Sequence, residues 1–351
     1  MINHNQIITN LLVPTLSTKV IYSAKYPTPS MQQCAPSDAV ERIFGASAGV
    51  SLIEAFLMKR EIKGPCWLTV RCPRSIESKA TYCKLEVGIE SPKFVCTSKP
   101  PANGAMPASP SLVSMSIALK TAVNPMTHVH EVIAVSGLIH TKVEADKDTE
   151  PKPALMKRFT YIRQLGVSCG VQYPSSFPHD LPKHIEQVDR QAGGKVVESF
   201  INERALLSRF FIRIQQEDPD ILSSHNLFGF EFDVLLSRAV ANKVPVWDRL
   251  GRLKKTRVPR SINDRDSVSG RILCDTYKAA KEFLRETTYS LTSLADTQLH
   301  SKRVEVDPVD VPRFFSTSLD ILKIANHTAM DAMIVQRLML KLQIVPLTKV
   351  S

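Results

Sequence analysis

The pattern of apolar and polar positions predicts a group of strands in the middle of the chain. Apolar residues recur at strand spacing over Leu112–Lys120 and Glu131–Ile139, and the turn-like sequence Asn124–Thr127 stands between them. This arrangement predicts a β-hairpin. A highly charged stretch, Thr141–Arg158, then predicts a solvated loop, and a third strand is predicted over Arg158–Leu165.

After Asn202 the apolar period becomes helical. Leu206, Leu207 and Phe210 fall on one face of a helix predicted over Glu203–Gln216. The remaining predicted elements are short strands over Asp220–Ser224 and Arg271–Cys274 and helices over Phe230–Val240, Thr276–Glu286, Ser290–Leu299, Ser316–Ala325 and Thr328–Gln343. Strands followed by strand–helix alternation indicate an α/β layer fold.

The N-terminal part has a different pattern. A helix is predicted over Val50–Arg60 and strands over Cys66–Arg71 and Tyr82–Ile89, which together indicate a small α+β module. Thr97–Ser111 contains four prolines and several small polar residues. Because proline fits neither a helix interior nor a central strand, we interpret this stretch as a linker between two domains.

Composition narrows the class of protein. A chain of 351 residues suggests about two domains. No apolar stretch reaches the roughly 18 residues of a membrane span, so we expect no membrane partner. The seven cysteines form no C-x-x-C pair, which argues against a zinc module. The net charge of +11 favours a polyanionic partner such as nucleic acid, with a basic surface kept for solubility as the alternative.

Two polar residues follow the predicted strand Asp220–Ser224. Asn226 and Glu231 stand where a strand ends and a helix begins, and sites in open α/β sheets form at such carboxyl ends. The alternative is that Asn226 caps the turn and Glu231 favours the helix N-terminus.

His327 and Asp331 open the last predicted helix. Asp331 lies on its apolar face one turn before Val335, and His327 lies one turn earlier. A carboxylate on a buried face is costly unless it has a partner. Asp331 therefore either caps the helix or belongs to a site.

A basic loop covers Arg249–Arg271, with eight basic and two acidic residues. It is a candidate for contacts with phosphates or for a localisation signal, and a merely solvated loop is the alternative. The candidate nucleic-acid-binding residues are Arg249, Arg252, Lys254, Lys255, Arg257, Arg260 and, from the preceding turn, Asn226.

Five segments, in this order, resemble the catalytic subunits of the alpha class of family B replicative DNA polymerases. They are Leu57–Leu68, Lys120–Val135, Asp218–Glu231, Arg249–Lys255 and His327–Leu347. The resemblance implies that residues 1–105 are part of the family's N-terminal domain. It also implies that residues 106–351 are a 3′→5′ exonuclease-like domain with an RNase H-like core, a mixed sheet flanked by helices.

The resemblance also implies which positions would carry catalysis. Proofreading relatives have D-x-E on the first strand, an Asp after the motif's Asn, and Y-x-x-x-D on a late helix, and these carboxylates hold two metal ions that activate water. The matching positions here are Ala118, Lys120, Glu231, His327 and Asp331. Only two carboxylates remain, so we expect no bound metal and no proofreading.

The polymerase palm motifs D-x-x-S-L-Y-P-S and Y-G-D-T-D-S are absent. We therefore expect a fragment or truncated product that has neither polymerase nor exonuclease activity on its own, with Mg²⁺ implied only for the full polymerase. The implied partners are DNA or RNA–DNA template–primer and the subunits of the polymerase alpha–primase complex, in the nucleus. Two alternatives stay open. One is an active metal-dependent exonuclease in which Asp275, Glu131 or Asp233 replaces the lost ligands, and the other is a docking scaffold of the replication machinery.

Overall fold

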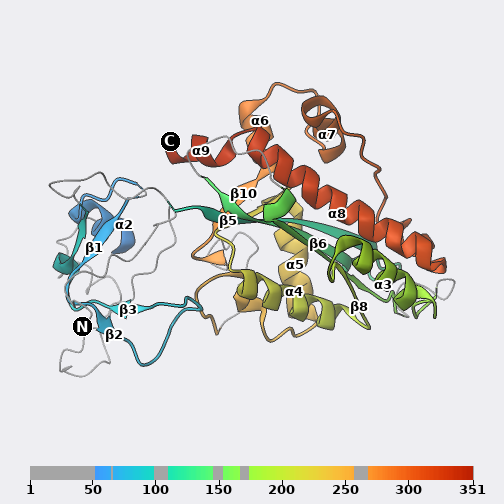
Figure 1. Ribbon diagram of the computed structural model, residues 1–351, viewed down its shortest axis with the longest axis horizontal. Coiled ribbons are helices and arrows are strands. Elements are labelled where there is room, and N and C mark those ends of the chain that lie inside the picture. The colour runs from blue at the N-terminus through green and yellow to red at the C-terminus, as the bar shows by residue number, and fades with distance from the viewer. Residues whose placement is uncertain are drawn as a thin grey trace. The chain divides into compact units, whose positions relative to one another are not determined.

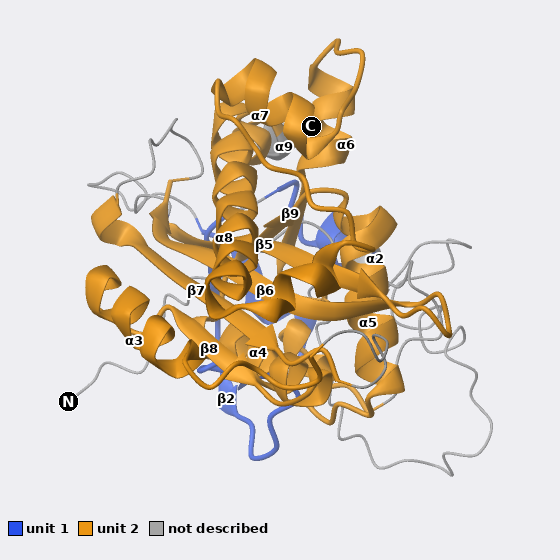
Figure 2. Cartoon of the chain, turned by 90° about the vertical axis from the view of Figure 1, so that its right-hand side faces the viewer, with its two compact units in different colours: residues 1–110 blue, residues 111–351 orange. Residues whose placement is uncertain are grey.

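The computed structural model describes residues 52–64, 66–98, 110–144, 153–166, 174–256 and 268–350. The chain divides into two compact units, residues 1–110 and 111–351, which Figure 2 colours separately. Among the described residues, no helix has both the length and the apolar character needed to cross a membrane.

In its described residues, unit 1 contains one α-helix and two small antiparallel strand pairs. Helix α2 covers Leu52–Lys59, β1 (Leu68–Val70) pairs with β4 (Val95–Thr97), and β2 (Arg74–Ser75) pairs with β3 (Val87–Gly88). The predicted strand Tyr82–Ile89 was thus wrong except at its end. The reason is Glu86, whose carboxylate accepts the backbone N–H groups of Ala80 and Thr81 at 3.0 and 3.1 Å and folds this stretch into a loop. Most of the predicted linker lies outside the described residues.

Unit 2 is built on a six-stranded mixed sheet with the order β10-β9-β5-β6-β7-β8. Its strands are β5 (Leu112–Val123), β6 (His130–Val143), β7 (Met156–Arg163), β8 (Val197–Phe200), β9 (Ile221–Ser224) and β10 (Ile272–Asp275). β5, β6 and β7 form an antiparallel meander, whereas β9 pairs parallel with both β5 and β10. The predicted hairpin and α/β fold class are confirmed.

Helices cover both faces of this sheet (Figure 1). The described helices of unit 2 are α3 (Leu181–Ala192), α4 (Glu203–Glu217), α5 (Phe232–Ala241), α6 (Thr276–Phe283), α7 (Leu291–Leu299), α8 (Ser318–Lys341) and α9 (Ile344–Val350). α4 and α5 pack on one face and α8 crosses the other. Successive strand side chains point to opposite faces, so Met115 and Ile117 of β5 join the core with Phe210 of α4, while Ala118 packs against Ala332 of α8.

The last two predicted helices are one continuous helix, α8. We placed a break between Ala325 and Thr328, but the hydrogen-bonded helix runs through this point. As a result Asp331 lies in the middle of α8 rather than in a first turn. The interpretation of Asp331 as a helix cap is therefore wrong.

Gly137 of β6 allows close packing against β7. It lies opposite Phe159 in the antiparallel register, and a Cβ at position 137 would come within 2.3 Å of the Phe159 ring. We therefore expect Gly137→Ala to lower the free energy of unfolding by about 1–3 kcal/mol, measured by urea unfolding, because overpacking forces neighbours to move. In a Phe159→Leu background the same alanine should cost much less. An equal cost in both backgrounds would show that the ring is not the obstacle.

Candidate active site

The structure brings the five positions implied by the resemblance together. Ala118 and Lys120 come from β5, Glu231 from the turn after β9, and His327 and Asp331 from successive turns of α8. β5, β9 and β10 run parallel, so their carboxyl ends share one edge of unit 2. The strand register shifts between Lys120 and Thr121, which marks a bulge in β5 beside this site.

Asp331 forms a buried ion pair with Arg303, a residue that we did not predict from the sequence. The Arg303 guanidinium donates from Nε to Oδ1 at 2.7 Å and from Nη2 to Oδ2 at 3.0 Å, so it engages both carboxylate oxygens. The two side chains are only 11% and 7% exposed. Arg303 also donates to the Thr292 hydroxyl at 2.6 Å, which ties α7 to the same site. Burial on the apolar face of α8 signalled that Asp331 needs a partner, but no sequence pattern identified Arg303.

Lys120 places a second cation in the site. Its side chain is buried, and burial lowers the pKa of its ammonium group, while the carboxylate of Asp331 partly opposes that shift. Within the described part of the chain, its ammonium makes no ion pair within 4.0 Å. Lys120 therefore acts on its neighbours through its field rather than through a direct contact.

Glu231 is a carboxyl group held in its neutral form. Burial raises its pKa to about 8, the nearby Asp331 and Asp275 add to this shift, and the Leu119 backbone N–H and Lys120 oppose it. Its Oε2 is buried and has no hydrogen-bond partner among the described residues. At neutral pH Glu231 is therefore mostly protonated, and a protonated carboxyl is a poor metal ligand.

Two histidines border the site and are uncharged. Burial lowers the pKa of His225 to about 4, and burial together with Lys120 lowers the pKa of His327. His225 contacts the Thr276 hydroxyl at 3.1 Å through Nδ1. Their neutral rings add no positive charge at physiological pH.

The turn between β9 and α5 has a strained backbone that the sequence partly explains. Asn226 adopts a left-handed conformation with φ 58°, which asparagine tolerates better than most residues. Its backbone carbonyl accepts the N–H groups of Phe230 and Glu231. Its side chain packs against Gly229, where an added Cβ atom would lie only 2.2 Å from Asn226 Oδ1. Asn226 thus shapes the turn that delivers Glu231 to the site through its backbone carbonyl, whereas its side chain makes none of the capping hydrogen bonds that the turn-cap interpretation expected.

The carboxylate of Asp275, a proposed substitute metal ligand, accepts hydrogen bonds from three backbone N–H groups. Its carboxylate accepts the N–H groups of Asn226 at 3.0 Å, Tyr277 at 3.0 Å and Phe228 at 3.3 Å. It caps α6 and ties that helix to the β9–α5 turn.

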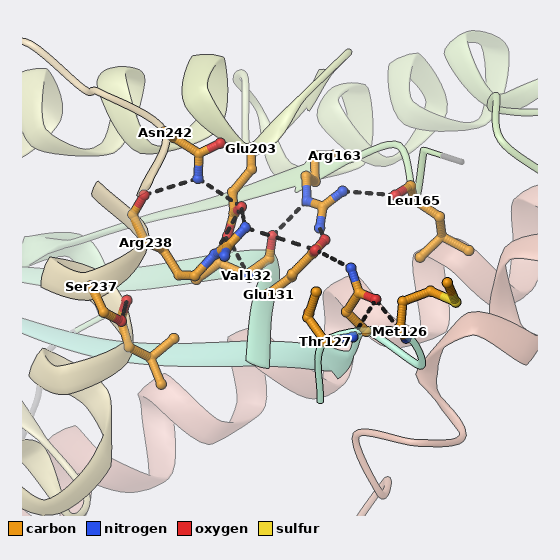
Figure 3. A network of polar contacts seen from close by, with 12 residues as sticks. Met126, Thr127, Glu131, Val132, Arg163, Leu165, Glu203, Ser237, Arg238 and Asn242 are labelled. Atoms are coloured by element: carbon orange, nitrogen blue, oxygen red, sulfur yellow. Dashed lines mark hydrogen bonds and ion pairs between the residues drawn. The ribbon is translucent and has the colours of Figure 1, made fainter. Parts of the chain in front are cut away.

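Glu131, another proposed substitute, belongs to a separate buried network (Figure 3). Its Oε2 accepts from Arg163 at 2.7 Å and its Oε1 from Asn124 at 2.8 Å. Next to it, Glu203 of α4 accepts the Val132 backbone N–H and pairs with Arg238 of α5. These contacts stabilise the junction of the hairpin with α4 and α5. Arg163 and Asn124 thus occupy the oxygens of Glu131 that a metal would need.

The basic loop is only partly described, since Arg257 and Arg260 lie outside the described residues. Arg252 differs from our expectation. All three of its guanidinium nitrogens donate within the protein, including to Asp218 at 2.9 Å and to Asp220 at 2.7 Å. We therefore assign Arg252 a structural role. Nucleic-acid contacts by the other candidates stay a prediction.

The residues at this site do not fit a pair of divalent cations. No group of three or more His, Cys, Asp or Glu residues suited to a metal occurs in the part of the chain that the structure describes. Ala118 supplies no ligand, Lys120 brings a positive charge, and Arg303 occupies both oxygens of Asp331.

Comparison with known proteins agrees with the resemblance seen in the sequence. Residues 42–294 match the family model described as DNA polymerase family B, exonuclease domain. The chain is 34% identical to the DNA polymerase alpha catalytic subunit of Oryza sativa subsp. japonica, over 93% of this chain and 22% of that protein. Identity is 32% to the subunit of Sterkiella nova and 30% to that of Xenopus laevis, each over 94% of this chain and 22% and 21% of the relative. The chain thus spans about a fifth of the length of these relatives. It belongs to the family B DNA polymerases, as an RNase H-like exonuclease region similar to that of the alpha catalytic subunits.

Proposed function

We propose that unit 2 is an exonuclease-like domain that has lost proofreading and contacts template–primer DNA as part of a replicative family B polymerase. The observation that carries this proposal is the Arg303–Asp331 pair next to Lys120. Two side-chain cations stand among the site's carboxyl groups, where nuclease chemistry needs two metal ions. We further propose a nuclear location and the subunits of the polymerase alpha–primase complex as partners, because the relatives are alpha catalytic subunits.

Electrostatics supports the loss of cleavage. Two metal ions about 3.5–4 Å apart require several shared carboxylates, and the side-chain cations repel any approaching metal ion. The protonated state of Glu231 removes another negative charge. The metal site therefore lacks ligands and also carries charge of the wrong sign.

An active exonuclease with substitute ligands is disfavoured by the same contacts. Asp275 accepts three backbone N–H groups, and Glu131 pairs with Arg163. Asp233 lies in the first turn of α5, on the helix that contacts the opposite face of the sheet from α8.

The test of the proposal is digestion of labelled single-stranded DNA with Mg²⁺ or Mn²⁺. We expect no cleavage above background. Cleavage that is lost in Asp331→Ala would overturn the proposal. Absence of DNA binding at physiological salt, together with tight binding to replication proteins, would instead favour the docking scaffold.

We also expect the double variant Ala118→Asp with Lys120→Glu to remain inactive in this assay. The two new carboxylates would face an Asp331 that is still paired with Arg303. Glu231 and His327 would still differ from the catalytic pattern. Recovery of robust cleavage would show that the two strand positions were the whole defect. Adding Arg303→Gln to the double variant tests whether the guanidinium is the remaining obstacle.

A further inference from the structure

Helix α6 and the β9–α5 turn place two aromatic rings beside two lysines. The Nζ atom of Lys278 lies 4.4 Å from the centre of the Phe228 ring, and that of Lys281 lies 4.6 Å from the centre of the Tyr277 ring. Both lysines are exposed and both rings are half-buried. The surface therefore presents partly exposed aromatic rings and positive charge together.

This surface is held in place by buried contacts. The Asp275 carboxylate accepts the backbone N–H groups of both Tyr277 and Phe228, so one side chain fixes the two elements that carry the rings. The His225 ring packs edge-on against Tyr277 with 5.7 Å between ring centres. Lys278 and Lys281 are three residues apart on α6, which puts them on one side of the helix.

The two lysines keep their charge available to a partner. Neither forms an ion pair with a carboxylate in the described regions. Three arginines of unit 2 differ, because Arg252, Arg271 and Arg303 all pair with aspartates. The cation–π contacts of exposed lysines are weak compared with the stacking of a nucleobase on an aromatic ring, so a base could displace an ammonium group from a ring face.

We propose that Phe228, Tyr277, Lys278 and Lys281 form a contact surface for single-stranded nucleic acid. The rings would stack on unpaired bases while the lysines neutralise phosphates, the combination that sequence-tolerant single-strand binders use. A duplex fits less well, because its bases are already stacked on one another. This inference rests on the proposed DNA-contacting function and assigns it to particular residues.

The experiment measures binding of a fluorescein-labelled single-stranded DNA 20-mer to the full 351-residue chain by anisotropy, across a salt series. The test variant is Lys278→Gln with Lys281→Gln. The matched control is Lys183→Gln with Lys195→Gln, which removes the same charge from exposed lysines in α3 and before β8. β8 and β10 are opposite edges of the sheet, so the control lies far from α6.

We expect the test variant to bind at least about 5-fold more weakly than the control, and its salt slope to fall by about 1.4, since each phosphate contact with a single strand contributes about 0.7. Tyr277→Leu should weaken single-strand binding by about 5-fold or more and change duplex binding little. If the parent chain binds DNA but the test and control double variants lose affinity equally, the proposal of this contact surface is overturned while the proposed function stands. Equal losses on duplex and single strand for Tyr277→Leu would overturn the stacking. No binding by the parent chain would overturn both proposals.

Discussion

Arg303→Ala is expected to lower the free energy of unfolding by about 3–5 kcal/mol, because it leaves a buried carboxylate without its partner. Asp331 is 7% exposed and receives two hydrogen bonds from Arg303. The same change removes the hydrogen bond that Arg303 donates to Thr292, so α7 loses one of its contacts with the site, although the Thr292 hydroxyl still donates to Glu305 at 2.9 Å. Urea unfolding followed by circular dichroism measures the loss.

Two further variants separate the ion pair from simple loss of a side chain. Arg303→Met combined with Asp331→Leu should recover most of the stability, since apolar groups of similar size often replace a buried pair without cost. Lys323→Ala should change stability by less than about 1 kcal/mol, because its pair with Asp320 is on the surface, with the lysine 62% exposed. Equal destabilisation by Arg303→Ala and Lys323→Ala would contradict the special role of the buried pair.

Glu231→Gln is expected to remove a pH dependence of stability. The pKa of Glu231 is about 8 in the folded chain and near its ordinary value of 4.5 when unfolded. The folded state therefore holds the proton more tightly, and the resulting stability is complete below pH 4.5 and lost as the pH rises to 8. One pKa unit corresponds to about 1.4 kcal/mol, so the loss is on the order of 3–5 kcal/mol.

The measurement is unfolding in urea at several values of pH between 5.5 and 8.5. Glutamine keeps an oxygen that can accept the Leu119 N–H, so the variant should become the more stable protein at the alkaline end. The difference between the two proteins isolates Glu231 from the histidines, which titrate in both. Glu282→Gln, an exposed residue of α6, serves as the control and should run parallel to the parent. A parallel profile for Glu231→Gln would mean that its carboxyl is already ionised at neutral pH.

The elements predicted from the sequence have either a long apolar run or a periodic apolar face. β5 and β6 are buried along almost their whole length and α4 has a periodic apolar face, and their positions were confirmed to within a few residues. Helix α3 was missed although Leu181, Ile185 and Val188 stand at helical spacing and pack on one cluster, because the polar residues between them leave only Leu181 fully buried. α8 was split because the adjacent polar residues Asn326 and His327 interrupt its apolar pattern at the point where the break was placed.

The sequence predicted which residues form the candidate site, but not their ion pairs or their states of protonation. The family resemblance assigned the five positions, and the structure places them together near the carboxyl ends of β5 and β9. The irregular stretch after α7 has no periodic pattern, so the sequence could not show that Arg303 reaches Asp331 across 28 positions of the chain. Likewise, the neutral state of Glu231 depends on burial by elements from separate parts of the chain.

The buried amide of Gln336 links the position of α8 to the state of the site. Its side chain bonds to the hydroxyls of Ser114 at 3.0 Å and of Ser116 at 2.5 Å, both in β5, and it lies five residues after Asp331. A rigid helix cannot slide along the sheet at Asp331 without breaking these bonds as well. Any neighbouring chain that pulls on the far end of α8 would therefore move the Arg303 pair at the same time, and amide exchange in β5 would report that movement.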